Sequence, residues 1–304
     1  MSSPKKYRAL LILFLAVTFY SCKKDPVIDP PPDPVVLWHD AQEKLQTDTT
    51  LPGVAEHMAL GNPGNATRNT DNFLNYLIAK PQYCLSYNKD RGTPNWVSWH
   101  LDNYWLGTAP RQDDFRADTS LPAGWYRVQN TDYTGSGFDR GHNTPSADRT
   151  RTVSDNSATF LMTNMIPQAP ANNQQTWANL ENYCRTLVNN GSELYIIMGN
   201  YGTGGTGSNG SQNTIANGHV TIPSHIWKVI VVLPQGENDA ARVQASTRVI
   251  AVDTPNINTI STSWGTYRTS VNTIELATGY NLLSVLPTAV QQAIELKVDN
   301  GPTQ

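Results

Sequence analysis

The sequence predicts an α+β domain built mainly on an antiparallel sheet. Two aromatic runs with alternating polarity stand close together and are separated by a turn sequence, which indicates a β-hairpin. Further along, several apolar runs have the length of buried strands, and one segment carries apolar residues at helical spacing. The chain has 304 residues, of which 38% are hydrophobic, and contains no internal repeat. This is enough material for one large domain or two small ones.

The predicted hairpin joins Gln82–Asn88 to Asn95–Leu101 through the turn Lys-Asp-Arg-Gly-Thr-Pro. Three later apolar runs predict further strands, namely Leu194–Met198, His225–Leu233 and Arg242–Asp253.

The predicted helix spans Trp177–Val188, because its apolar residues recur every three or four positions. Asn-Asn-Gly at 189–191 is a suitable C-terminal cap for it. Val271–Ala277 predicts a second, shorter helix. The glycine-rich segment 201–211 has neither a phosphate-loop nor a dinucleotide pattern, and we expect a mobile surface loop there.

The N-terminus carries a charged stretch, with Lys5, Lys6 and Arg8, followed by the apolar residues 9–20. This stretch is too short to span a bilayer and has the form of a signal peptide, residues 1–21. Cys22 follows a small residue directly after it and resembles the lipidated cysteine of bacterial lipoproteins. The alternative is an ordinary signal peptide with a chance cysteine.

The remaining chain divides by composition. Residues 22–36 carry the lipidated cysteine and a proline-rich tether, residues 37–57 form a lead-in of uncertain structure, and residues 58–295 form the folded domain. We expect an exported protein on the periplasmic or surface side of an outer membrane. Cys84 and Cys184 form either one disulfide or two small buried side chains. The oligomeric state is left open.

The charge of the chain argues mildly against tight binding of a polyanion. The formal net charge is −3, and loss of residues 1–21 changes it to −6, because Lys5, Lys6 and Arg8 leave without any acid. Six aspartates accompany the six arginines between Arg111 and Arg151. A nucleic-acid protein usually shows a basic surface. A local site built around a dication remains compatible with this composition.

Asp-Arg-Gly-His at 139–142 is the centre of the functional prediction. His142 is the residue type whose protonation is most easily set near neutral pH, so it suits a general base. Arg140 offers a planar fork that matches phosphate oxygens. The tripeptide alone proves nothing, because Asp90-Arg91-Gly92 repeats it before Thr93 in the predicted hairpin turn.

Two further segments follow in order, Thr-Asn-x-x-Pro-Gln at 163–168 and Asn-x-x-x-Trp-x-x-Leu-Glu at 173–181. Asn173 stands near the start of the predicted helix, where an amide oxygen can face a hard cation. Taken singly, Asn173 is most often a helix cap, Glu181 a solvated side chain, and a lone histidine a structural residue.

The three segments together, in this order and spacing, resemble the DNA/RNA non-specific endonuclease family. The likeness covers roughly residues 58–290, and it extends to other short matches: Met58–Pro63, Arg111 with Phe115 and Asp118, Ile222-Pro223 before Trp227-Lys228, and Thr278–Tyr280. The resemblance implies the ββα-metal (His-Me finger) endonuclease fold. It also implies Mg²⁺, with Mn²⁺ as the alternative, and hydrolysis of DNA and RNA.

The resemblance implies a role for each residue. His142 matches the general base, Asn173 the direct protein ligand of the metal, and Glu181 a group that holds metal-bound water. Arg140 and Arg111 match phosphate-contacting arginines, with Arg116 as the nearby alternative to Arg111. Asn164 matches a supporting residue near the histidine.

The helix geometry adds one expectation. If Asn173 were already helical, Glu181 would lie about 12 Å further along the axis. We therefore expect Asn173 to lie in a loop that folds back. A catalytically inactive lipoprotein that binds with the same fold, and a hydrolase of another phosphodiester, are the alternative functions.

Overall fold

The computed structural model describes residues 50, 51 and 53–304. The predicted signal peptide 1–21, Cys22, the tether 22–36 and most of the lead-in 37–57 lie outside the described residues. In the described part of the chain, no helix has the length and apolar composition needed to cross a membrane.

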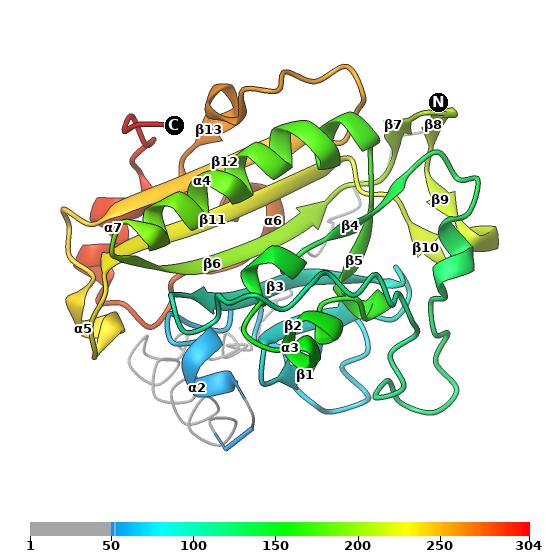
Figure 1. The fold of residues 1–304 in the computed structure, drawn as a ribbon, viewed down its shortest axis with the longest axis horizontal. Coiled ribbons are helices and arrows are strands. Elements are labelled where there is room, and N and C mark those ends of the chain that lie inside the picture. The colour runs from blue at the N-terminus through cyan, green and yellow to red at the C-terminus, as the bar shows by residue number, and fades with distance from the viewer. Residues whose placement is uncertain (1–49, 52) are drawn as a thin grey trace, which may run out of the picture.

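Seven strands of the described region form one sheet in the order β1-β2-β3-β6-β11-β12-β13, and all neighbours pair antiparallel (Figure 1). This confirms the predicted α+β class with a mainly antiparallel sheet. The strands are β1 (Tyr76–Lys80), β2 (Tyr83–Asn88), β3 (Thr93–Leu101), β6 (Ser192–Tyr201), β11 (His225–Pro234), β12 (Arg248–Pro255) and β13 (Arg268–Thr269).

The predicted hairpin is confirmed as β2 and β3, and two of the later runs lie inside β6 and β11. The third prediction, Arg242–Asp253, is wrong in its first part. Arg242 ends the short helix α5 (Asp239–Arg242), where it pairs with Asp239, and Thr247 closes a turn back to Gln244. Strand β12 therefore begins only at Arg248.

Helices cover both faces of the sheet. Helix α4 (Ala178–Asn189) lies along one face (Figure 1), and its residues Leu180, Cys184 and Val188 pack on the aliphatic and aromatic side chains of that face. Helices α2 (Val54–His57), α6 (Val271–Thr278) and α7 (Thr288–Glu295) pack on the opposite face. Alternate strand residues thus feed two separate cores, as the two-residue period of a strand requires.

The helix predictions hold for α4 and α6. Helix α4 ends at Asn189, and Gly191 has a φ of 91°, as a glycine just after a helix end often does. Cys184 lies in the core beneath α4 and Cys84 in the core on the other face, so no disulfide joins them. Both are buried small side chains.

A third core lies outside the large sheet and supports the segment with the Asp-Arg-Gly-His motif. Here β4 (Asp139–His142) pairs antiparallel with β5 (Met165–Gln168). The glycine-rich segment is ordered into the hairpin β7 (Gly205–Gly207) and β8 (Gly210–Gln212), rather than an open loop, because Ser208 N–H donates to Gly137 O at 2.9 Å. The short pair β9 (Thr214–Ile215) and β10 (Val220–Thr221) completes this region.

Shorter helices connect these parts. They are α3 (Val153–Ala158), the 3₁₀ turns η1 (Asn130–Tyr133), η2 (Ser146–Asp148), η3 (Met162–Asn164), η5 (Ala216–Gly218) and η6 (Trp264–Tyr267), and the π-helical turn η4 (Asn172–Trp177).

Candidate active site

The His142 imidazole packs against two phenylalanine rings, whose centroids are themselves 4.9 Å apart. Its centroid is 5.5 Å from that of Phe115 and 4.9 Å from that of Phe160, with edge-to-face geometry at both. Its Nε2 is buried and has no hydrogen-bond partner among the described residues. Burial, with Arg111 and Arg140 adding repulsion, lowers the pKa of His142 to about 3. The ring is therefore neutral at pH 7 and can accept a proton.

Two arginines cap these phenylalanines. The Arg140 guanidinium lies 4.4 Å from the Phe115 centroid, and that of Arg111 lies 4.9 Å from the Phe160 centroid. Two positive charges thus lie close to His142. Such a pair suits a phosphate, whose oxygens both guanidinium groups can bind.

Hydrogen bonds orient both arginines. Arg140 Nη1 donates to Asn130 Oδ1, and Arg111 donates to Asp113 at 2.6 Å and to Ser146 Oγ at 2.9 Å. Arg116, the alternative to Arg111, instead binds the Asp114 carboxylate at 2.7 Å. Arg111, unlike Arg116, lies over the Phe160 ring and lowers the pKa of His142, which favours Arg111 as the second arginine of the site.

Asn164 holds the chain that follows His142. Its Oδ1 accepts the Thr144 N–H at 3.0 Å, and its Nδ2 donates to Thr144 O and Thr159 O, each at 2.9 Å. Its backbone carbonyl accepts the Asn143 N–H at 3.0 Å. Asn164 is fully buried. These hydrogen bonds hold the residues that directly follow β4 in place.

The expectation that Asn173 lies in a loop is wrong. Asn173 belongs to the π-helical turn η4, which runs directly into α4, and its N–H donates to Ala169 O at 2.9 Å. The helical segment already begins at Pro170, a residue well suited to the first turn of a helix. Single π-helical turns inside α-helices are frequent at functional sites.

Two asparagines that the sequence analysis missed secure this early helix start. Asn256 Oδ1 accepts the Ala169 N–H at 2.7 Å, and Asn258 Oδ1 accepts the Ala171 N–H at 2.9 Å. These bonds satisfy N–H groups that have no acceptor within the helix. Neither asparagine stands near a motif in the sequence, so only the fold reveals their role.

The Asn173 side chain meets Asp139, the first residue of the Asp-Arg-Gly-His motif. Asn173 Nδ2 donates to Asp139 Oδ2 at 2.8 Å, and Gln174 Nε2 donates to the same oxygen at 2.8 Å. Asn173 Oδ1 accepts no hydrogen bond from any described residue. A neutral amide oxygen left available in this way fits a hard cation such as Mg²⁺.

Glu181 lies in α4 and contacts Lys228. Glu181 Oε1 is 3.6 Å from Lys228 Nζ, and Lys228 is only 1% exposed. The ammonium group lies 4.9 Å from the Trp177 ring and 5.4 Å from the Trp99 ring. Burial raises the pKa of Glu181, while Lys228 and Arg185 oppose this shift.

The structure therefore gathers only part of the predicted set. His142, Arg111 and Arg140 share the two phenylalanines, and Asn173 reaches the same strand through Asp139. No interaction between described residues links Glu181 with His142 or Asn173.

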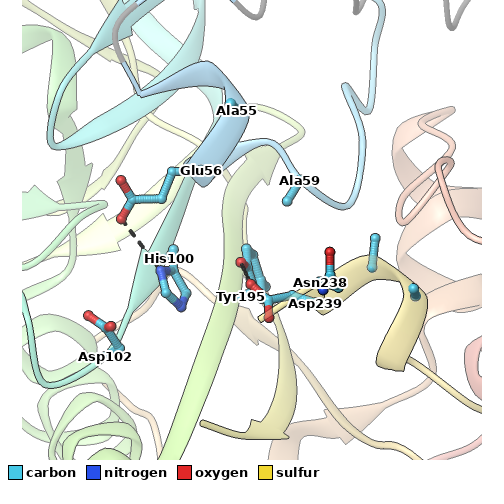
Figure 2. A pocket seen from close by; sticks show the side chains of 10 residues that line it. Ala55, Glu56, Ala59, His100, Asp102, Tyr195, Asn238 and Asp239 are labelled. Carbon is cyan, nitrogen blue, oxygen red and sulfur yellow. Dashed lines mark hydrogen bonds and ion pairs between the residues drawn. The ribbon is translucent and has the colours of Figure 1, made fainter. Parts of the chain in front are cut away.

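A second cluster of metal-binding residue types lies elsewhere, around a pocket lined by His100, Tyr195 and Asp239 (Figure 2). Ligand atoms of His100, Glu193 and Asp239 lie within 4.8 Å of one another. Arg242 already bridges the two carboxylates, however, and His100 Nε2 is 3.2 Å from Glu193. The carboxylates of Glu193 and Asp239 therefore already have a cationic partner within the protein. No residue of the Asp-Arg-Gly-His segment or of the two segments after it lines this pocket.

Comparisons with known proteins show the family of this chain. The model of the DNA/RNA non-specific endonuclease family matches residues 60–289. A nuclease from Nostoc sp. is 51% identical over 249 residues, covering 82% of this chain and 88% of that protein. Human mitochondrial endonuclease G is 34% identical over 169 residues, covering 54% of this chain and 57% of that protein.

The comparison with solved structures also indicates an endonuclease. The chain is similar to a chain in a crystal structure of the EndoG/EndoGI complex, with a TM-score of 0.62 and 25% identity, covering 78% of this chain and 94% of that one. The protein therefore belongs to the DNA/RNA non-specific endonuclease family, has its ββα-metal fold and is a metal-dependent endonuclease.

Proposed function

We propose that this endonuclease is Mg²⁺-dependent and sequence-tolerant, and that it hydrolyses phosphodiester bonds of DNA and RNA with His142 as general base. The observation that carries this proposal is the neutral imidazole of His142 beside two phenylalanines that are capped by arginines. No base-reading group is needed at such a site, because phosphate contacts carry no sequence information.

His142 takes the proton of the attacking water at a ring nitrogen while the water oxygen forms a bond to phosphorus. The bond from phosphorus to the leaving oxygen breaks, and that oxygen takes up a proton to give an alcohol and a phosphomonoester. General-base help of this kind typically contributes about 10²–10⁴-fold in rate.

Arg111 and Arg140 bind the phosphate and also adjust the base. In the substrate-free protein their charges help to lower the pKa of His142. A phosphate between them offsets those charges, so the pKa of His142 rises when substrate binds.

Asn173 Oδ1 would hold the metal, and Asp139 keeps the amide nitrogen turned away from it. When bound there, Mg²⁺ would supply positive charge that stabilises the phosphorane and the departing oxygen. Glu181, kept beside Lys228, would orient water around the metal. Asn164 keeps the chain after His142 in place.

Digestion of plasmid DNA and of RNA by the purified full chain tests the metal and the substrate. We expect cleavage of both polymers with Mg²⁺, a comparable or weaker rate with Mn²⁺, and none with EDTA. Cleavage that persists in EDTA would overturn the metal role, and intact RNA would restrict the substrate to DNA. Binding without cleavage by folded protein would favour the inactive binding protein instead.

We further propose that Cys22 carries a lipid that anchors the enzyme to the periplasmic or surface side of the outer membrane of its bacterium. The support is the apolar run that ends at Cys22 and the proline-rich residues after it. Labelling of cells with radioactive palmitate should mark the wild-type chain and leave Cys22→Ala unlabelled. Equal labelling of the two would refute the anchor.

A further inference from the structure

An exposed aromatic pair lies outside the residues assigned above. The rings of Tyr126 and His219 stack with centroids 3.9 Å apart and an interplanar angle of 5°. Tyr126 is 36% exposed, and His219 is exposed as well. The two residues are far apart in the sequence, so tertiary structure, rather than local geometry, brings them together.

The turn that presents His219 is strained. Three successive residues have positive φ angles, Ala216 (55°), Asn217 (54°) and Gly218 (92°). Alanine rarely adopts this conformation, because its Cβ approaches the backbone. The pairing of β9 with β10 and the burial of Ile215 and Val220 hold the turn in place. Strained backbone of this kind tends to be kept where a side chain must be presented precisely.

A short chain of hydrogen bonds connects the pair to the active site. The Tyr126 hydroxyl donates to Asp132 Oδ2 at 2.9 Å, and the same oxygen accepts the Gln129 N–H at 2.8 Å. Asp132 lies in η1 together with Asn130, which accepts a hydrogen bond from Arg140. The aromatic pair is thus attached to the element that orients a phosphate-binding arginine.

The span suits a strand of nucleic acid. The path from the Tyr126 hydroxyl through Asp132 and Asn130 to the Arg140 guanidinium is on the order of 15 Å long, which is an upper limit on their separation. At ~3.4 Å per stacked nucleotide, this limit corresponds to about four nucleotides. The next residue, Arg127, is exposed and adds a positive charge beside Tyr126.

We propose that Tyr126 and His219 form a stacking platform for an unpaired nucleobase of the substrate strand, a few nucleotides from the scissile phosphate. This inference rests on the proposed function. Every base has an aromatic face, so such a platform binds single strands without reading their sequence. Bases in a duplex are covered by their neighbours, and the platform therefore favours single-stranded or frayed substrate.

Fluorescence of 2-aminopurine tests the platform, because stacking quenches this base. The full chain carrying His142→Ala binds single strands of ~12 nucleotides, longer than the expected span, each with 2-aminopurine at a different position. We expect quenching at one or two adjacent positions only. Tyr126→Ala and His219→Ala should abolish that local quenching and weaken binding about tenfold.

Two control variants identify the cause. Tyr126→Phe keeps the ring but loses the hydroxyl, so quenching should persist if stacking is responsible. Tyr104→Ala removes another exposed tyrosine, 59% exposed, and should leave the quenching pattern unchanged. Uniform quenching along the strand, or an unchanged pattern in Tyr126→Ala, would overturn the inference.

Kinetics of the catalytically intact chain separate this inference from the proposed function. Tyr126→Ala should raise the KM for the long strand about tenfold relative to the KM for a dinucleotide. An equal effect on both substrates would mean that Tyr126 acts through Asp132 and Arg140, and the platform would be wrong. Absence of any cleavage by the wild type would instead contradict the proposed function.

Discussion

Asn173 donates its side-chain N–H to the Asp139 carboxylate at 2.8 Å, so the helix that would hold the metal is tied to the strand that carries His142. This bond decides which atom of the asparagine remains available. The amide nitrogen is engaged, and Oδ1 is left for a cation.

Loss of Asp139 should therefore weaken metal binding. In Asp139→Ala the Asn173 amide can rotate, and we expect the metal concentration for half-maximal activity to rise about 10–100-fold. Titration of activity with Mg²⁺ measures this. Asp90→Ala is the matched control, because Asp90 begins the second Asp-Arg-Gly tripeptide of the chain. A metal titration of Asp139→Ala that overlays the wild type would contradict this role.

Protonation of His142 should make the free energy of unfolding depend on pH in the acidic range. Its pKa is lowered from 6.5 to about 3 in the folded protein, so the unfolded chain binds the extra proton between these values. Stability contributed by this group is complete above pH 6.5 and falls with decreasing pH by up to about 1.4 kcal/mol per pH unit. The slope ends near pH 3.

Urea unfolding between pH 4 and 7 measures that slope. Burial also lowers the pKa of His57 to about 3, so the wild type carries two such contributions. His142→Ala should remove one of them and flatten the dependence. Parallel curves for wild type and His142→Ala would show that His142 is not buried as a neutral ring.

Asn256 should be important for stability although it lies in no motif. Its side chain accepts the Ala169 N–H at 2.7 Å and donates to Pro167 O and Pro223 O at 2.9 Å each. At about 1 kcal/mol for each bond, Asn256→Ala should cost about 3 kcal/mol in the free energy of unfolding. Asn258→Ala, which loses one bond to Ala171, should cost less. Equal urea midpoints for the two variants would refute this ranking.

Lys228 should set the pH range in which Glu181 is ionised. Lys228 opposes the rise in the pKa of Glu181 that burial causes. In Lys228→Met that pKa rises further, so the acid side of the kcat profile should move to higher pH. Lys89→Met is the control, since Lys89 also lies over an aromatic ring, 5.0 Å from that of Phe73. An unshifted acid limb in Lys228→Met would remove Glu181 from the mechanism.

The sequence correctly predicted those strands whose residues follow a clear pattern. The hairpin of β2 and β3 and the runs in β6 and β11 combine β-branched or aromatic residues with a defined turn or length. Arg242–Asp253 also looked like a strand, but the ion pair with Asp239 and the turn to Thr247 interrupt it. Strand propensity, which is read from residue types alone, does not show that an ion pair and a turn will interrupt a strand.

The sequence named residues of the candidate site but did not predict how they lie. The motifs named His142, Arg140 and Asn173, and the structure brings these onto one strand and the adjoining helix. The position of Asn173 was wrong, because the acceptors that start its helix at Pro170 come from Asn256 and Asn258, over eighty residues away. The contribution of Phe160 was likewise invisible, since it depends on a tertiary contact with His142.

Cleavage of plasmid DNA by His142→Ala, beside His225→Ala and the wild type, tests the central claim most directly. His225 lies on β11, pairs with Asp253 of β12 and is not part of the proposed site. We expect a loss of about 10²–10⁴-fold in rate for His142→Ala with Mg²⁺, and a wild-type rate for His225→Ala. Undiminished cleavage by folded His142→Ala would mean that another group activates the water and that the assigned active site is wrong.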